Sequence, residues 1–563
     1  MAKKVKDFEY SRPDLAGYAK FIAEATERVK KAKSAKEIVD IREEVNSRGN
    51  AVSTSSAIAY IRHSLNVNDE FYAKEQDYFD ENFPAVGAKG SEFNRAIVES
   101  PFIDEIKKLL NPLIVKNLEA QVRVMDERIV EDCVEENKLV SEYDQLRANI
   151  KYPWEGREIT QSELMSYTKN KDREVRKKAF TVLGQTLEAN SAKLDELYDK
   201  LVKVRDRKAK KMGFKNFVEM GNLAMGHIGY TREDVKVFRE SVLHDVVPAL
   251  KRLKSDLAKR LKLDKIHIYD NDAYIAGGNI NPVGTAKDLF NAAQSMYDDM
   301  NPALGEFFRE MSDAEAFDYE ARAGKGAGGY CEIIYDYGQP FIFANFNGTM
   351  DDVGVLTHEF GHAFAFKRAY VNKIDTDIFV GGMETAETHS MAMEQLCNKY
   401  NDKFYGARAK EATYQQIFDA FNFLPYGVIV DYFQELVYEK PEMTPAERKA
   451  LWLKLEGEFR PYVDMSDIPY INIGGRWQYQ HHIYESPFYY IDYCLSTCMA
   501  LQFGEKAEKD FKGALSRYLN LVEAGGTKDI NELAHEAGLK SPFDVGSLKD
   551  LCPEVEKHIK SLQ

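Results

Sequence analysis

The chain has 563 residues, 44% hydrophobic and 30% charged, a composition that excludes collagen-like, low-complexity and disordered proteins. This length exceeds what one hydrophobic core supports, so two or more packed lobes are expected. The formal net charge is −15 and the basic residues do not gather in one block. We therefore expect no nucleic-acid partner, which would need a positive stripe.

The ends and the cysteines of the chain indicate where the protein resides. Residues 1–10 are charged and contain no apolar core of signal-peptide length. No apolar run is long enough to span a bilayer. Six cysteines are thinly spread, which favours free thiols over a disulfide framework. The sequence predicts a cytoplasmic protein without a membrane partner.

Helical periodicity dominates the chain. Apolar residues recur at three- and four-residue steps over residues 15–29, and again over residues 235–257. Thr231 is the expected N-cap of the second segment, and Pro248 is expected to kink it. We predict a mainly α fold. We divide it into an N-terminal helical region, residues 1–192, and a second region, residues 193–563, which contains the motifs described below.

One segment departs from the helical pattern. Residues 330–346 read YCEIIYDYGQPFIFANF and are rich in Ile, Phe and Tyr around a Gly-Gln-Pro turn, which predicts a β-hairpin or small sheet. The preceding Gly324–Gly329 stretch lacks the Gly-Lys-Ser/Thr ending of a phosphate loop. We expect it to be a flexible loop beside a cleft.

The segment VLTHEFGHAFAF carries a candidate metal motif. His358 and His362 lie one helical turn apart, so both imidazoles can reach one ion, and Glu359 lies beside the first. A His-acid-x-x-His string arises by chance only about 0.03 times in a chain of this composition. Catalytic zinc sites use three protein ligands and leave a position for water, whose pKa the metal lowers to roughly 7. Glu359 would then act as general base and general acid.

The third ligand must come from another helix. Ala365 and Arg368 stand where related motifs place Gly and a third His. The downstream segment GGMETAETHSMAMEQL offers three glutamates, and spacing alone does not choose among Glu384, Glu387 and Glu394. We expect one zinc ion per chain, although cobalt or manganese could occupy the same ligands.

Three blocks of the chain resemble one family. The blocks are NFNGTMDDVGVLTHEFGHAF at residues 345–364, AETHSMAME at residues 386–394 and HHIYESPFYYIDY at residues 481–493. They are similar to oligoendopeptidase F and the Pz-peptidases, within the thimet-oligopeptidase-like zinc metallopeptidases. The resemblance implies two helical lobes around a deep substrate channel, with a small β-sheet beside the zinc-binding helix. It also implies a zinc endopeptidase that hydrolyses short, unstructured oligopeptides, with residues 193–563 as its catalytic region.

The same resemblance implies roles for individual residues. Glu387 matches the family's third zinc ligand, and His482 its substrate-binding histidine. Tyr489 and Tyr493 match tyrosines that donate hydrogen bonds to the substrate carbonyl, where negative charge develops. A shift of the alignment by one residue would select His481 and Tyr490 instead, so Tyr490 remains a further substrate-binding candidate. The strand at residues 341–346 is expected to present a free edge that pairs with an extended substrate. Tyr484 and Phe488 are expected to be core aromatics.

Two alternative functions stay open. A metallo-carboxypeptidase on a similar helical scaffold would need a basic group for the substrate's terminal carboxylate. A non-catalytic, zinc-containing peptide-binding protein would have no use for Glu359, because a purely structural zinc site usually fills all four positions with protein ligands. A peptide blocked at both ends separates the endopeptidase from the carboxypeptidase.

Overall fold

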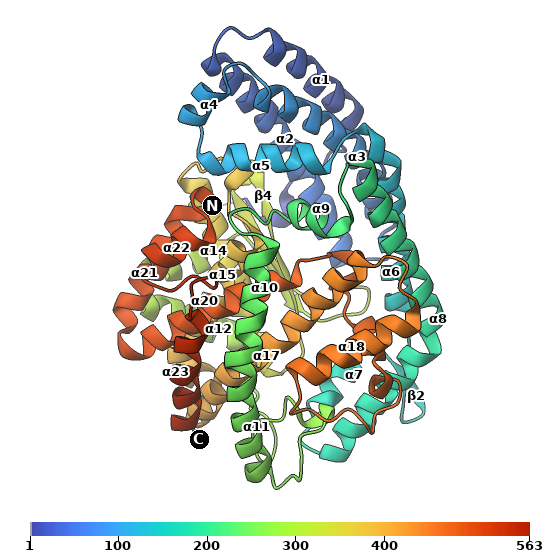
Figure 1. Ribbon diagram of the computed structural model, residues 1–563. Coiled ribbons are helices and arrows are strands. Elements are labelled where there is room, and N and C mark those ends of the chain that lie inside the picture. The colour runs from blue at the N-terminus through green and yellow to red at the C-terminus, as the bar shows by residue number, and fades with distance from the viewer. Residues whose placement is uncertain (1–2) are drawn as a thin grey trace.

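The computed structural model describes residues 3–563, so residues 1 and 2, where the predicted N-terminal region begins, lie outside the described part. Helices form most of the molecule and the strands are few and short (Figure 1). The predicted mainly α fold is confirmed.

The first five helices form a cap above the rest of the molecule (Figure 1). They bury an apolar cluster of their own, centred on side chains such as Ile38 and Ile106. Ser34 and Asp69 cap the second and third helices through hydrogen bonds from backbone N–H groups. The helices are α1 (Leu15–Lys31), α2 (Ala35–Leu65), α3 (Glu70–Val98), α4 (Ile103–Leu109) and α5 (Pro112–Val124).

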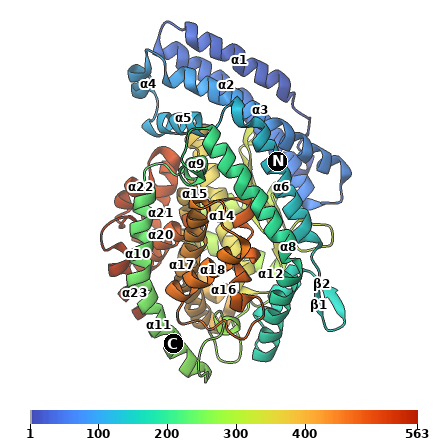
Figure 2. The same ribbon diagram turned by 45° about the vertical axis from the view of Figure 1, so that its right-hand side comes forward.

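Long helices α6 (Val130–Asn149) and α8 (Arg173–Lys211) run down one side of the body (Figures 1 and 2). Between them lie the hairpin β1 (Tyr152–Trp154) and β2 (Arg157–Ile159) and the helix α7 (Gln161–Thr168). Residue 192 falls inside α8, so the division at that residue would cut a continuous helix. That boundary stays a prediction.

Helix α10 (Arg232–Ser241) begins at Thr231, the predicted N-cap, whose side chain accepts a hydrogen bond from the Asp234 N–H. A π-helical turn at Val242–Val246 joins it to α11 (Val247–Leu261). Pro248 lies in the first turn of α11, where its missing N–H removes one bond of the helical ladder. The continuous periodicity of residues 235–257 therefore conceals an interruption just before the proline.

A three-stranded sheet lies beside the cap, and it confirms the β-structure predicted at residues 330–346. Its order is β3 (Phe317–Glu320), β5 (Gln339–Phe346), β4 (Tyr330–Ile334), with β5 parallel to β3 and antiparallel to β4. The prediction that residues 341–346 form a free edge is wrong, because β5 is hydrogen-bonded on both sides. The edge strands of this sheet are β3 and β4.

The remaining helices surround the end of β5 and bury the main apolar core. Figures 1 and 2 show α14, α15 and α20 packed in the interior of the body. The helices in chain order are α9 (Phe217–Ala224), α12 (Ala286–Met300), α13 (Pro302–Asp313), α14 (Met350–Val371), α15 (Met383–Cys397), α16 (Asn401–Tyr405), α17 (Ala409–Glu439), α18 (Pro445–Phe459), α19 (His482–Glu485), α20 (Tyr490–Lys509), α21 (Phe511–Ala524), α22 (Ile530–Glu536) and α23 (Ser547–Ser561).

Several sets of polar contacts join the cap to the body. The end of α2 is hydrogen-bonded to the glycine-rich loop that leads into β4: Gly326 N donates to the Ser64 carbonyl at 2.7 Å, and Val67 N donates to the Gly324 carbonyl at 2.8 Å. On the other side, Arg42 of α2 pairs with Asp375 and Asp377, which lie between α14 and α15.

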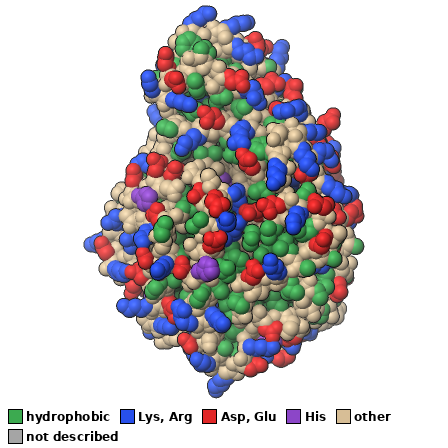
Figure 3. Space-filling model, viewed as in Figure 1, with side chains coloured by type: hydrophobic (Ala, Val, Ile, Leu, Met, Phe, Trp, Pro, Cys, Tyr) green, Lys and Arg blue, Asp and Glu red, His purple; other side chains and the backbone are tan. Residues whose placement is uncertain are grey.

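The face shown in Figure 3 mixes Lys and Arg with Asp and Glu side chains, with hydrophobic side chains between them. Within residues 3–563, none of the helices has both the length and the apolar composition that crossing a bilayer requires.

Candidate active site

Helix α14 carries the His-Glu-x-x-His motif and follows directly from the central strand β5. The Asp352 side chain fixes the turn between them, accepting hydrogen bonds from Asn347 N at 2.9 Å and Gly348 N at 2.7 Å. Carboxylates at the start of a helix are also favoured by its dipole. The sheet therefore sets the position and direction of the motif helix.

The three predicted metal ligands converge. The ligand atoms of His358, His362 and Glu387 lie within 4.8 Å of one another, the one such group among residues 3–563. The Glu387 Oε2 atom is 3.2 Å from His358 Nε2 and 3.5 Å from His362 Nε2. Two imidazoles and one carboxylate match the donor set of catalytic zinc sites. The residues present therefore fit a zinc ion.

A second glutamate orients the first imidazole. His358 Nδ1–H donates to Glu394 Oε1 at 2.7 Å, which leaves the Nε2 lone pair directed at the ligand cluster. Sequence reasoning listed Glu394 only as a possible ligand. Glu387 and Glu394 are seven residues apart, two helical turns on one face, and this spacing is the signal for a ligand and its supporting carboxylate. Glu384 is buried outside this cluster. Burial and the nearby Asp492 raise the pKa of its carboxylate.

The two acidic groups of the cluster have pKa values shifted in opposite directions. Burial raises the pKa of Glu359, which is 7% exposed, against the opposing effect of the two histidines. Burial would also raise the pKa of Glu387, but the adjacent imidazoles outweigh it and hold that pKa well below its ordinary value. Glu387 is thus the charged acid of the two, while Glu359 is the stronger base.

Gly361 allows α14 and α15 to approach closely. A Cβ atom at this position would lie 2.7 Å from the Ser390 Cα and 2.8 Å from the His389 carbonyl oxygen. Such distances are too short for any side chain. The glycine inside the motif therefore brings the helix of Glu387 within reach of the two histidines.

The C-terminal block supplies an aromatic cluster beside the ligands. The ring centroid of His482 is 4.9 Å from that of Tyr490, 5.8 Å from that of Tyr493 and 6.0 Å from that of Tyr489. Gln480 Nε2 donates to His482 Nδ1 at 2.6 Å, which places the imidazole proton on Nε2. Burial lowers the pKa of His482 to about 3, so the ring is neutral.

The predicted residues of this block differ in their contacts. The Tyr489 hydroxyl donates to Glu387 Oε1. The ring of Tyr493 lies beside that of Tyr489, with 4.9 Å between the ring centroids. Tyr490 packs edge-on against Tyr426. His481 bonds Glu485 at 2.8 Å, so His482, and not His481, has its ring partners among these tyrosines.

Tyr484 and Phe488 are fully buried, which confirms that they are core aromatics. Gln480 was absent from the sequence-based site. Its position two residues before His482 carries no signal by itself, because only the turn preceding α19 directs its amide at the imidazole.

Comparisons with known proteins agree with this geometry. A family model described as Peptidase M3 N-terminal domain matches residues 5–125, and one described as Peptidase family M3 matches residues 166–551. The solved structure of Pz peptidase A with inhibitor 2 is 38% identical, with a TM-score of 0.94 over 99% of each chain.

Two bacterial relatives are more distant. Oligopeptidase PepF of Bacillus subtilis is 22% identical over 398 residues, 68% of this chain and 56% of its own length. Oligoendopeptidase F of Lactococcus lactis subsp. cremoris is 22% identical over 416 residues, 70% of this chain and 65% of its own length. The chain thus spans somewhat more than half of each of these relatives. The resemblance found in the sequence is confirmed: this chain belongs to peptidase family M3.

Proposed function

We propose that this chain is a zinc-dependent endopeptidase that hydrolyses short, unstructured oligopeptides in the cytoplasm. One observation carries the proposal: His358, His362 and Glu387 converge within 4.8 Å, and Glu359 stands on the same helical turn as the first ligand. Membership of the M3 peptidase family supports peptide hydrolysis, and the named relatives support oligopeptides as the substrate class. The six free thiols fit a reducing compartment.

In this proposal His358, His362 and Glu387 hold one zinc ion, with Glu394 fixing the orientation of His358. Bound zinc supplies Lewis acidity, which lowers the pKa of a water molecule and polarises the scissile carbonyl. Glu359 removes the proton of the attacking water and passes it to the leaving amine. Its raised pKa brings its basicity closer to working pH.

Negative charge that develops on the carbonyl oxygen needs donors that are already in place. The His482 Nε2–H and the hydroxyl of Tyr493 are those donors in our proposal. The Tyr489 hydroxyl stabilises Glu387 by donating a hydrogen bond to the Oε1 atom of that glutamate. Tyr490 completes the aromatic wall against which the substrate lies.

The edge strand β4 provides the surface along which an extended peptide could pair. The outer side of β4 faces away from β5. Cys331 on this strand lies close to Glu359, because burial and then the Glu359 carboxylate raise the pKa of its thiol. Main-chain hydrogen bonds to an edge strand accept any sequence but only an extended backbone. This favours unstructured peptides over folded proteins.

The proposal is tested with an internally quenched peptide blocked at both ends. The zinc-loaded protein should cleave it, and Glu359→Gln should lower kcat by about 10²- to 10⁴-fold with the zinc content unchanged. Glu536→Gln, an exposed acid on α22, serves as the control and should behave as wild type. Equal cleavage by wild type and Glu359→Gln would refute the role of Glu359. Cleavage of unblocked peptides alone would favour an exopeptidase.

A further inference from the structure

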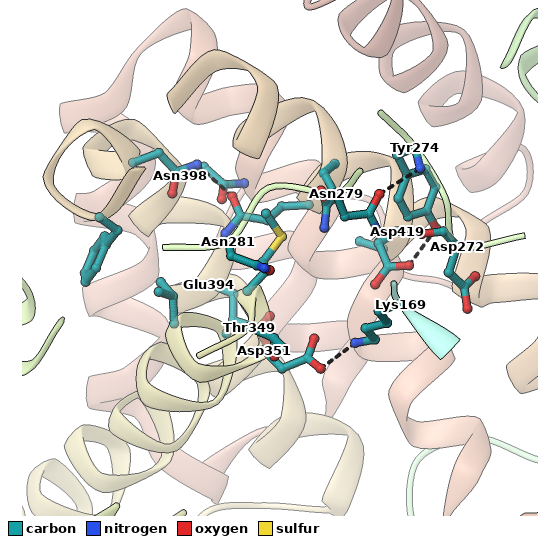
Figure 4. Close-up of a pocket in the computed structure, with 18 of the residues that line it drawn as sticks. Lys169, Asp272, Tyr274, Asn279, Asn281, Thr349, Asp351, Glu394, Asn398 and Asp419 are labelled. Atoms are coloured by element: carbon teal, nitrogen blue, oxygen red, sulfur yellow. Dashed lines mark hydrogen bonds and ion pairs between the residues drawn. The ribbon is translucent and has the colours of Figure 1, made fainter. Parts of the chain in front are cut away.

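A cavity of about 600 Å³ adjoins the metal-ligand cluster (Figure 4). Its walls are the first turns of α14, parts of α15, α17 and α20, and the loop between α11 and α12. Glu394 lines it with the same carboxylate that accepts the hydrogen bond from His358. The volume lies in the range of about 300–1,000 Å³ that ligand sites occupy. Glu394 therefore links the cavity to the proposed catalytic centre through its hydrogen bond with His358.

Two carboxylates without an ion-pair partner line one end of the cavity. Asp272 and Asp419 lie together in Figure 4, away from Glu394, and both are exposed to the cavity. No salt bridge within residues 3–563 involves either of them. The Tyr274 hydroxyl donates to Asp419 Oδ1 at 2.6 Å. Asn422 Nδ2 is 3.2 Å from that hydroxyl and 3.5 Å from Asp272 Oδ1. Neighbouring groups thus hold the two acids in fixed positions.

The surroundings disfavour two negative charges at this end. Burial and the proximity of Asp272 raise the pKa of Asp419 to about 6. Carboxylates that share an enclosed site repel each other, and a cation placed between them relieves that repulsion.

The positive charges near the acids are mostly occupied. Lys169 pairs with Asp351, and Arg408 pairs with Glu411. Lys254 lies behind Tyr274 and donates to the Asn271 carbonyl instead of lining the cavity, and burial lowers its pKa to about 7. Lys171 is the remaining cation of the lining. Lys169 also attracts Asp419, and Arg476 attracts Asp272, but neither cation forms an ion pair with these acids.

Two amide groups give a second, independent indication of a ligand. Gln395 and Gln415 line the cavity and are 8% and 7% exposed. Each side-chain oxygen accepts a hydrogen bond, from Asn398 Nδ2 and Ile280 N respectively. Neither Nε2 group has an acceptor in the described part of the chain. Neither Nε2 is among the fully buried unpaired atoms, so both donors reach the cavity, and peptide carbonyls are suitable acceptors for them.

We propose that this cavity is a substrate subsite in which Asp272 and Asp419 bind one cationic nitrogen of the peptide, while Gln395 and Gln415 bind its carbonyl groups. The cation is a Lys or Arg side chain or a free amino terminus. An organic cation fits better than a metal ion, because these two acids have no third metal-ligand side chain converging on them within residues 3–563, unlike the His358 cluster. The inference rests on the proposed peptidase function and names a specificity for it.

The test uses internally quenched, end-blocked peptides that differ at one position, which carries either lysine or norleucine. That position is scanned across both sides of the cleaved bond. Wild type should cleave the lysine peptide with about tenfold higher kcat/KM at one position, as expected for a hydrogen bond between charged groups. Acetylation of the lysine side chain should remove the advantage. A lysine-free peptide with a free or an acetylated amino terminus tests the other source of the cation. The subsite is wrong if no cationic group in either set is preferred.

Substitutions of Asp272 and Asp419 test whether the preference for lysine arises in this cavity. Asp272→Asn and Asp419→Asn should each lose most of the lysine advantage, measured within each variant as the ratio of kcat/KM for the lysine peptide to kcat/KM for the norleucine peptide. Asp256→Asn makes the same charge change on the exposed face of α11 and should keep the advantage. A preference that survives both pocket substitutions would refute the assignment. If either variant misfolds, the wild-type comparison of lysine, acetyl-lysine and norleucine still decides whether a cationic subsite exists.

A binding measurement separates this inference from the proposed function. The same peptides, labelled for fluorescence anisotropy, are titrated into the Glu359→Gln protein. Tighter binding of the lysine peptide without cleavage of any peptide by wild type would support the subsite and refute the peptidase. Cleavage of the norleucine and lysine peptides at equal rates, together with no preference for a free over an acetylated amino terminus, would support the peptidase and refute the subsite.

Discussion

At the scale of single residues, the candidate site depends on groups that hold other groups in place. Glu394 orients His358 from the side opposite the ligand cluster, and Gln480 orients His482. Such supporting contacts commonly alter metal affinity or activity without touching the metal or the substrate.

We expect Glu394→Gln to weaken zinc binding by about 10- to 100-fold, because a neutral amide stabilises the Nδ1-protonated form of His358 less than a carboxylate does. The measurement is a competition titration against a chelating dye. Glu536→Gln is again the control. Unchanged zinc affinity would show that His358 holds its orientation without this contact.

We expect Gln480→Leu to lower kcat/KM by about tenfold, because His482 loses the donor that keeps its proton on Nε2. The informative comparison is a double-mutant cycle with His482→Ala. If Gln480 acts through His482, adding Gln480→Leu to that variant should cost little more. Independent, additive losses would place Gln480 outside this hydrogen-bond chain.

Sequence reasoning identified the cluster because its ligand types and spacing are imposed by chemistry. His358 and His362 must share a helical face, and that requirement is visible in the chain. The choice of Glu387 over Glu384 and Glu394 came from the family resemblance, because all three could lie on one helix. Gln480 could not be predicted, since its role depends on a turn whose course no local pattern records.

At the scale of elements, the packing of α14 on α15 decides whether the ligands meet. Gly361 lies at the contact, whereas a Cβ at Gly354 on the same helix would meet nothing within 4 Å.

We expect Gly361→Ala to lower the free energy of unfolding by about 1–3 kcal/mol, as overpacking does, and to weaken zinc binding by separating the two helices. Gly354→Ala is the matched control. It should raise the free energy of unfolding by up to about 1 kcal/mol, because alanine is the better helix former. Denaturant unfolding of both variants measures the difference, and equal effects would refute the close-contact argument.

The sheet shows what a one-dimensional pattern omits. The hydrophobic run at residues 339–346 predicted a strand, but it could not reveal that β3, which precedes it by some twenty residues, pairs on its far side. A strand buried on both faces and a strand with a free edge can have the same composition. Whether a strand lies at the edge or in the centre of a sheet depends on its neighbouring strands, and these are known only from the folded chain.

At the scale of the whole molecule, apolar and polar contacts both join the cap to the body. Ile61 of α2 belongs to the main core, and Ile378 of the body belongs to the apolar cluster of the cap. Ion pairs and hydrogen bonds are the polar contacts. Arg42 is the most enclosed of these contacts, with a side chain 2% exposed, and it pairs with Asp375 and Asp377. Removing one partner of such a pair leaves uncompensated charge.

We expect Arg42→Met to loosen the docking of the cap, seen as faster hydrogen exchange in α1–α5 with little change in α14 and α15. Arg28→Met is the control, since Arg28 pairs with Glu44 within the cap and is well exposed. Unchanged exchange in the Arg42 variant would show that apolar contacts alone hold the cap.

Lowering the pH should also loosen the docking of the cap. Burial alone would raise the pKa of Asp375, but Arg42 outweighs it and holds the pKa below its ordinary value. The contribution of the pair is therefore complete above the unfolded pKa of about 3.9 and is lost as pH falls through the lower folded value. Exchange in α1–α5 of wild type should rise in that window, and Arg42→Met should show less of this dependence.

The hydrogen bonds between α2 and the loop before β4 constrain how this molecule can open. Ser64 and Val67 hold the loop at Gly324 and Gly326, and a few residues later the chain becomes the strand along which a peptide could lie. A cap that swings outward must either break these bonds or carry β4 with it. If they persist, the cap, the loop and β4 move as one rigid unit. The strand that pairs with the peptide would then separate from α14 and α15 each time the molecule opens to release its products.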